Sequence, residues 1–273
     1  MAKGKQEVQA QGNMFPATTD FDDDYRRMLE ESAGQGVSRK TEDNLIPLIT
    51  IFQANSKPVN RQGGAYVEGA EPGGFWLRGA TPPVVDGNNG LVFQPCFFYK
   101  DFAEWIPRDQ GGGLVGMHRA LPDNAQEVRD ERNPNKVRWR LPNGHELLER
   151  RNHVGFIVKE DGHSAPYAFP CTSTLHSVSR AWMTTMGNRI MDGFSPPSWA
   201  FLYRLKTRQR SNAQGTWFTV DITPVNQHPV LNAKGMVNKE LFMQGKALYE
   251  SALAGEKLAA EMDDEETVAD GAM

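Results

Sequence analysis

The sequence predicts a mainly β fold of the α+β class, an OB-like five-stranded Greek-key barrel with a large loop insertion. Three observations support this prediction. Short β-branched runs are separated by Gly and Pro turns, one well-patterned helix precedes the last predicted hairpin, and an amphipathic helix follows that hairpin. An OB barrel places its helix between its third and fourth strands, which this order resembles. A sandwich of short strands is the alternative.

Strands are predicted where β-branched and aromatic residues form runs that turn residues interrupt. These strands are 45–52, 91–99, 102–107, 154–158, 166–171, 199–210 and 216–223. Lys100 and Asp101 predict a tight turn between the second and third strands, and Asp161-Gly162 predicts a hairpin turn between the fourth and fifth. The polar segment at about 109–150 is expected to be an inserted loop, because it is much longer than an ordinary connection.

Two helices are predicted. Residues 172–174 offer an N-cap for a helix that continues to about Met191. The stripe of this helix that is expected to pack in the core is Leu175, Val178, Trp182, Met186 and Ile190. The last helix, at about 238–258, has on one side Leu241, Phe242, Leu248 and Tyr249. The predicted organisation is a flexible acidic arm at 1–44, an OB-like nucleic-acid-binding domain at 45–230, a C-terminal helix at 231–260 and an acidic tail at 261–273.

The formal net charge of −4 conceals an uneven distribution. Residues 1–45 contain 6 basic and 9 acidic side chains, and residues 256–273 contain 1 basic and 7 acidic ones. Of the 30 basic and 34 acidic residues in the chain, 23 basic and 18 acidic residues therefore lie between 46 and 255. The regional charges are −3, +5 and −6, so a basic, aromatic-rich body lies between two acidic ends. This layout favours a nucleic-acid partner.

Absent motifs argue against several classes of protein. No apolar run approaches the roughly 18–20 residues of a membrane span, and no apolar signal segment follows Met1, so we expect the cytoplasm of the cell that makes the protein. Cys96 and Cys171 lack a CxxC partner and are expected to be buried thiols without a metal. No phosphate-binding loop or nucleophile motif occurs, so we predict no enzyme and no cofactor. In a nuclease, Mg²⁺ could be bound by Asp101, Glu104 and Asp109. The simpler interpretation is that these three carboxylates are solvated turn residues.

The segment 199–210 is the most informative candidate surface for nucleic acid. Side chains alternate along a strand, so one face is expected to present Arg204, Lys206, Arg208 and Arg210. No carboxylate interrupts this stripe along the strand, and its length of about 20 Å would span three or four phosphates of an extended single strand. The alternative is an exposed hairpin edge that its charge keeps soluble.

Aromatic and basic residues also interleave at 97–108 and 136–140. Single-stranded nucleic acid is held without sequence readout by rings on which bases stack and by cations that follow the backbone. The candidates for these contacts are Tyr99, Lys100, Trp105, Arg108, Arg138, Trp139 and Arg140. Trp139 lies between two arginines and is expected to be exposed, and Arg150-Arg151 repeat the cationic pattern.

The acidic tail suggests a regulatory mechanism. The last predicted helix is followed by Asp263, Asp264, Glu265 and Glu266. A tethered polyanion can occupy a cationic groove at high effective concentration, and DNA that displaces it releases it for partner proteins. A purely solvating tail is the alternative.

Several motifs resemble a family of tailed-bacteriophage proteins. They are Asp43–Pro47, Ala65–Ala70, Tyr99–Gly113, Ser173–Leu175 with Ser179–Trp182, and Pro196-Pro197 with Tyr203–Leu205. The resemblance covers about 43–225 and implies a single-stranded DNA-binding protein of the replication and recombination group. The acidic tail and the aromatic, basic body are similar to those of phage and bacterial single-stranded DNA-binding proteins in general. No defined set of binding residues transfers from the family.

These inferences predict a non-enzymatic phage protein that binds single-stranded DNA largely without sequence specificity. The expected partners are single-stranded DNA, replication and recombination proteins bound by the tail, and a second copy of the chain. The alternatives are a strand-annealing recombination protein, a recombinase mediator, and a virion or assembly protein that binds no DNA. RNA presents the same phosphates and stackable bases, so either nucleic acid fits the pattern.

Overall fold

The computed structural model describes residue 27 and residues 45–129, 137–213 and 215–254. The chain divides into two units, Met1–Lys40 and Thr41–Met273, and every element described below belongs to the second. The predicted arm, apart from Arg27, and the predicted tail at 261–273 lie outside the described residues. No helix in the described ranges is long and apolar enough to cross a membrane.

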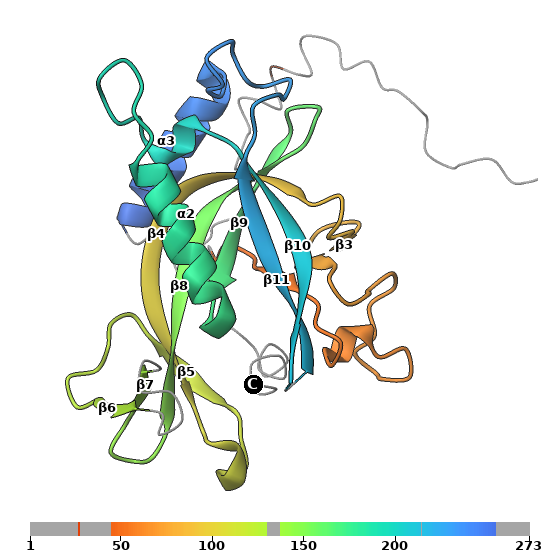
Figure 1. The fold of residues 1–273 in the computed structure, drawn as a ribbon, viewed down its shortest axis with the longest axis vertical. Helices are drawn as coiled ribbons and strands as arrows, with labels where there is room; N and C mark the ends of the chain where they lie inside the picture. The colour runs from red at the N-terminus through yellow and green to blue at the C-terminus, as the bar shows by residue number, and fades with distance from the viewer. Residues whose placement is uncertain (1–26, 28–44, 130–136, 214, 255–273) are drawn as a thin grey trace, which may run out of the picture. The chain divides into compact units, whose positions relative to one another are not determined.

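An antiparallel sheet of eight strands dominates the described part of the chain (Figure 1). Its strands are β4 (Leu91–Trp105), β5 (Leu114–His118), β6 (Gln126–Arg129), β7 (Val137–Arg140), β8 (Glu146–Val158), β9 (Ser164–Cys171), β10 (Tyr203–Asn212) and β11 (Gly215–Pro224). Their order is β11-β10-β4-β8-β7-β6, with β5 paired to β4 and β9 paired to β8. A smaller sheet contains β1 (Ile49–Ile51), β2 (Phe75–Leu77) and β3 (Val84–Val85).

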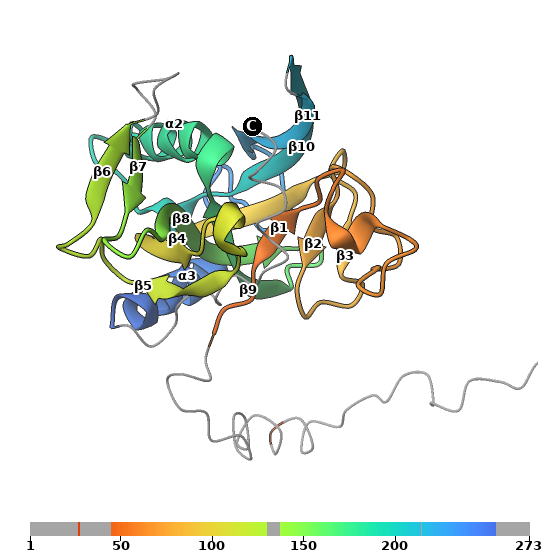
Figure 2. The same ribbon diagram turned by 90° about the horizontal axis from the view of Figure 1, so that it is seen from below.

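The predicted fold class is confirmed as mainly β with few helices, and the large sheet curls into a half-barrel (Figure 2). The OB barrel and its five-stranded Greek key are not confirmed. The long strand β4 pairs with β10 near its start, at 91–93, and with β5 near its end, at 102–105. Because β4 has 15 residues and β8 has 13, each is long enough to pair with different strands at its two ends.

The predicted turn at Lys100 and Asp101 is wrong, since β4 runs through both residues without interruption. Lys100 lies opposite Arg151 on β8, and Asp101 lies opposite Arg150. The Asp101 carboxylate accepts a hydrogen bond from Arg150 Nη2 at 2.6 Å. This charge partner is distant in sequence, so the local pattern showed only two polar residues that resemble a turn.

The predicted loop insertion at about 109–150 is also wrong, because it contains β5, β6, β7 and the start of β8. Strands β6 and β7 form a hairpin in which Gln126 lies opposite Arg140. Residues 130–136, between these two strands, lie outside the described residues. No residue of β6 or β7 is fully buried, so no apolar run marks these strands in the sequence.

The two predicted hairpins are confirmed. Strands β8 and β9 are joined at Gly162, whose φ of 84° favours glycine, and Lys159 N donates to His163 O at 2.9 Å. Strands β10 and β11 pair over their whole length, from Tyr203 opposite Pro224 to Asn212 opposite Gly215. Asn212 is thus still part of β10, beyond the predicted end of that strand.

The helices α2 (His176–Gly187) and α3 (Lys239–Leu253) cover opposite faces of the β4–β8 ribbon (Figure 2). On the α2 face, Phe93 and Ile157 belong to a core cluster that includes Trp182 of α2. On the α3 face, Val92 and Val158 belong to a cluster that includes Leu241 of α3. The alternation of side chains along each strand therefore supplies two cores. The free thiols of Cys96 and Cys171 are buried as predicted, and burial raises the pKa of both.

The helix boundaries differ from the prediction at α2 and agree at the start of α3. A 3-10 turn at Ser173–Leu175 precedes α2, and Thr172 makes no side-chain cap. Trp182 is buried, whereas Ile190, predicted in the same stripe, lies beyond the helix and is 72% exposed. Asn238 caps α3 by accepting a hydrogen bond from Leu241 N at 2.9 Å.

Candidate nucleic-acid interface

The predicted cationic stripe lies on β10 and faces away from the α2 core. Opposite residues of an antiparallel pair project to the same side of the sheet. Each stripe residue has a partner on β11: Thr223 lies opposite Arg204, Asp221 opposite Lys206, Thr219 opposite Arg208 and Trp217 opposite Arg210. Tyr203 and Leu205, which alternate with the stripe, are buried in the core cluster on the α2 side. Lys206, Arg208 and Arg210 are exposed, and Arg204 is half-buried.

The outer part of this hairpin projects beyond the sheet. Strand β10 pairs with β4 only at 203–205. The next contacts anchor the middle of the hairpin: Thr207 Oγ1 donates to Gly73 O at 2.6 Å, and the Gln53 side chain bonds the Phe218 backbone at 2.8 and 3.0 Å. We call residues 208–217 the hairpin tip. The described residues of this tip are exposed, except for the half-buried Trp217.

Carboxylates do approach the stripe, contrary to the pattern along the strand. Arg208 Nη2 lies 2.7 Å from Oδ1 of Asp221 on β11, and the two side chains form an ion pair. Arg204 Nη1 donates instead to Asn89 O at 3.4 Å. Within the described ranges, Lys206 and Arg210 have no carboxylate partner. These two side chains are therefore the stripe cations that are most available to an external anion.

The second predicted group, at 97–108, is divided between the two faces of β4. Tyr99 stacks on Phe97 with ring centroids 5.9 Å apart, on the α3 side. Lys100 projects to the other side and pairs with Glu149 at 3.2 Å. Trp105 is half-buried, and its Nε1 is buried without a hydrogen-bond partner. Arg108 begins a 3-10 helix, and its side chain lies outside the described part.

The third predicted group lies on β7. Arg138 and Arg140 both approach Glu146 Oε1, at 3.9 and 3.2 Å. Trp139 projects to the other side, opposite Leu147, and is half-buried instead of exposed. Exposed ion pairs of this kind contribute little to stability, but they do occupy both arginines.

Arg150, predicted as part of a cationic pattern, is instead a structural residue. Its guanidinium donates to both oxygens of Asp101, from Nε at 2.8 Å and from Nη2 at 2.6 Å. Arg150 is 1% exposed and Asp101 is 5% exposed. Neither the arginine nor the carboxylate is a solvated surface group, so the interpretation of Asp101 as a turn carboxylate is wrong.

Glu104 is likewise buried instead of solvated. His145 Nδ1 and His118 Nε2 each lie 2.6 Å from one of its carboxylate oxygens. Burial alone would raise the pKa of Glu104, but the hydrogen bonds from His145 and His118 lower it below its ordinary value. This carboxylate joins β4 to β5 and to the turn before β8. Within the described residues, no three His, Cys, Asp or Glu side chains are arranged to hold a metal ion.

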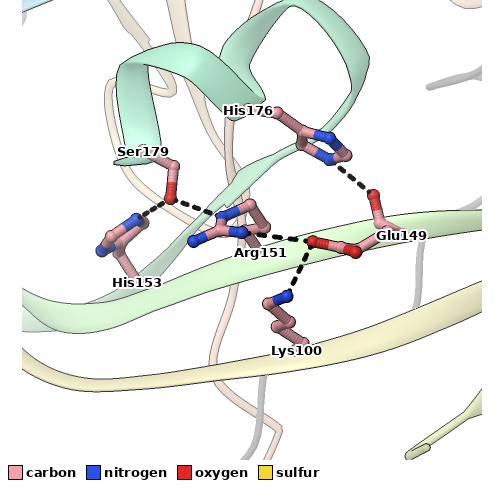
Figure 3. A network of polar contacts seen from close by, with 6 residues as sticks. All are labelled: Lys100, Glu149, Arg151, His153, His176 and Ser179. Carbon is pink, nitrogen blue, oxygen red and sulfur yellow. Dashed lines mark hydrogen bonds and ion pairs between the residues drawn. The ribbon is translucent and has the colours of Figure 1, made fainter. Parts of the chain in front are cut away.

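A polar network connects α2 to the sheet (Figure 3). Arg151 Nε donates to Ser179 Oγ at 3.0 Å, and that hydroxyl lies 2.8 Å from His153 Nε2. Ser179 Oγ therefore accepts from Arg151 and shares a hydrogen bond with the His153 ring, and burial of that ring favours its neutral form. Burial, assisted by Arg151, lowers the pKa of His153 to about 3. Glu149 extends the network to Lys100 and to His176, whose Nε2 donates to the Glu149 backbone oxygen at 2.9 Å.

This neutral histidine predicts a loss of stability in acid. The unfolded chain binds a proton at His153 below about pH 6.5, whereas the folded chain does so only near pH 3. The stabilisation is therefore complete above pH 6.5 and is lost progressively as the pH falls toward 3. We expect His153 to account for about 2 kcal/mol of lost unfolding free energy between pH 7 and pH 5.

Urea unfolding at both pH values, for the wild type and His153→Gln, measures this contribution. The difference in unfolding free energy between pH 7 and pH 5 should be smaller in His153→Gln than in the wild type. His163→Gln, at a histidine whose side chain is 81% exposed, is the control and should keep the wild-type difference. An equal pH dependence in the wild type and His153→Gln would contradict the assignment.

Sequence reasoning missed Trp217, which lies opposite Arg210 on the stripe face of the hairpin. The signal was present: the predicted turn at 211–215 separates two strands, and residues equidistant from a hairpin turn are neighbours. Counting outward from the turn therefore places Trp217 beside Arg210.

The fold and this surface define a mainly β protein that presents an exposed cationic hairpin. A family model described as Pam3 phage gp34-like protein matches residues 19–257, so the chain belongs to this family of phage proteins. The predicted resemblance is thus confirmed at the level of a phage protein family. No curated protein and no solved structure matches the chain.

Proposed function

We propose that this phage protein is a non-enzymatic single-stranded nucleic-acid-binding protein, and that the β10–β11 hairpin is its main contact surface. The observation that supports this proposal best is the row of four cations on one face of a hairpin that projects beyond the sheet. With a rise of about 3.3 Å per residue, this row is about 20 Å long. An extended single strand could place three or four phosphates along it.

Binding of this kind depends on phosphate contacts and is largely independent of base sequence. Lys206 and Arg210 are exposed, and the described residues provide no carboxylate partner for either, so they need no rearrangement to meet a phosphate. Arg208 is paired with Asp221, so we do not count it among the phosphate contacts of the wild type. The groups at Lys100 and at Arg138 and Arg140 are paired with Glu149 and Glu146, so we assign them a secondary role.

A direct test is the fluorescence anisotropy of labelled oligo-dT, with unlabelled duplex of equal length as competitor, at two salt concentrations. We expect oligo-dT to bind, the duplex to compete poorly, and affinity to fall with salt by about 0.7 log units per log unit of salt for each phosphate contact. Preference for the duplex, or no binding at physiological salt, would contradict the proposal. The latter result would favour a virion or assembly role, and strand annealing would favour a recombination protein.

Asp221→Asn should strengthen the salt dependence of binding. The substitution removes the carboxylate that Arg208 Nη2 contacts at 2.7 Å and frees the guanidinium for a phosphate. One additional contact should increase the magnitude of the log–log salt slope by about 0.7. Asp192→Asn, at an exposed carboxylate that pairs with Lys234, is the matched control and should leave the slope unchanged. An unchanged slope in Asp221→Asn would contradict the expectation that Arg208 gains a phosphate contact when Asp221 is removed.

We include the acidic tail in this proposal as a competitor for the hairpin. Asp263 to Glu266 form a polyanion tethered to the same chain, so their local concentration near the cations is high. DNA that displaces the tail would make it available to replication and recombination proteins.

A further inference from the structure

The geometry points to Trp217 as the residue that stacks on an unpaired base at the hairpin tip, with Arg210 contacting the adjoining phosphate. This inference rests on the proposed function and extends it from phosphate contacts to recognition of a base. A duplex does not offer an unpaired base to Trp217, because paired bases are already stacked on one another.

The position of Trp217 is fixed by the register of the hairpin. Trp217 lies directly opposite Arg210, and Arg208 opposite Thr219 is the diagonal neighbour of the same ring. Side chains directly opposite each other have Cβ atoms about 5 Å apart, and diagonal neighbours remain within reach of an aromatic ring. A ring and two guanidinium groups therefore share one face of an exposed ribbon. This combination suits a nucleotide, whose base needs a ring and whose phosphate needs a cation.

The other tryptophans are poorer candidates. Trp76 stacks on Phe52, Trp182 is packed against Tyr203, and Trp199 is packed against Tyr249. In the described part of the chain, Trp217 has no aromatic or cation–π partner. No other ring of the described residues therefore stacks on Trp217, so its ring can stack on a base.

Trp105 and Trp139 also lack a ring partner among the described residues, but their neighbours differ from those of Trp217. Trp105 lies opposite Glu146, and Trp139 lies opposite Glu127 and Leu147. A carboxylate beside the ring would repel the phosphate next to a stacked base. Of these three rings, only Trp217 has a cation directly opposite.

The test compares Trp217→Ala with Trp217→Phe in oligo-dT binding. Loss of the ring should weaken binding by at least about fivefold, whereas phenylalanine should retain most of the affinity because it retains a stacking face. Binding should quench the tryptophan fluorescence of the wild type and quench Trp217→Phe much less. Matched urea unfolding curves for the two variants exclude a folding defect.

A second comparison uses the wild type and an oligonucleotide that contains abasic sites. The wild type should bind the abasic oligonucleotide more weakly than oligo-dT, whereas Trp217→Ala should bind the two nearly equally. Equal binding of oligo-dT by the wild type and Trp217→Ala would overturn this inference and leave the proposed function intact. Failure of the wild type to bind any oligonucleotide would instead overturn the proposed function, and this inference with it.

Discussion

The double variant Lys206→Ala/Arg210→Ala should bind oligo-dT about 25-fold more weakly than the wild type at 0.1 M salt. Both side chains are exposed and have no carboxylate partner among the described residues, whereas Arg204 is half-buried and donates to Asn89 O. Each phosphate contact on a single strand contributes about 0.7 to the log–log salt slope, so two lost contacts remove about 1.4 log units of affinity at 0.1 M relative to 1 M salt. The measurement is an anisotropy titration at several salt concentrations, which reports the affinity and the slope together.

The control for this variant removes two positive charges elsewhere. Lys234 pairs with Asp192 and Lys246 pairs with Glu250, and both lysines are exposed. Lys234→Ala/Lys246→Ala has the same net charge as the hairpin variant, so it tests whether net charge alone determines binding. We expect its salt slope to equal that of the wild type. Equal losses of affinity in both variants would show that binding follows the overall charge and not the hairpin.

Arg150→Met should lower the free energy of unfolding by about 3–5 kcal/mol. The guanidinium is 1% exposed and donates two hydrogen bonds to Asp101. Its removal leaves the Asp101 carboxylate, itself 5% exposed, as a buried charge without this cation. The penalty is mainly that of desolvating this charge. Urea unfolding followed by circular dichroism measures the change.

The double variant Arg150→Met/Asp101→Leu separates this penalty from a loss of packing. Replacing both charges by apolar groups of similar volume is often close to neutral, so the double variant should recover most of the lost stability. Arg151→Met is a further comparison, because Arg151 lies beside Arg150 in sequence but has a side chain that is 11% exposed. An Arg150→Met variant as stable as the wild type would contradict the buried ion pair.

Local signals predicted those parts of the fold that nearby residues determine. The Asp161-Gly162 turn required a positive φ that Gly162 adopts, and the β10–β11 hairpin followed from two runs rich in aromatic or β-branched residues around a polar turn. Trp182 was correctly placed in the core by its helical spacing. These features depend on steric preferences and on hydrophobic periodicity, which short windows of sequence contain.

The features that were predicted wrongly depend on partners far along the chain. Asp101 resembles a turn residue until Arg150 is placed opposite to it, and Glu104 resembles a solvated carboxylate until His118 and His145 surround it. Burial of a polar side chain requires such partners, so no local pattern identifies it.

In the candidate site, too, features set by nearby residues were predicted, whereas features set by a second strand were missed. Alternation along one strand placed four cations on one face of β10, but the salt bridge to Asp221 and the position of Trp217 both come from β11. The register of the hairpin therefore determines which cations are available and which ring lies beside them. Residues 99–105 and 138–140 lie on other strands, where alternation separates Tyr99 from Lys100 and Trp139 from its two arginines. Arg108 lies beyond β4, in a 3-10 helix.

Photo-crosslinking tests the central claim most directly. An oligo-dT that contains 5-iodo-deoxyuridine is bound to the full chain and irradiated, and the cross-linked tryptic peptides are identified by mass spectrometry. A base stacked on the hairpin tip should cross-link at Trp217, in the peptide 211–234 that follows cleavage at Arg210. Cross-links confined to other peptides, or no cross-link at saturating oligonucleotide, would contradict the assignment of the β10–β11 hairpin as the single-strand interface.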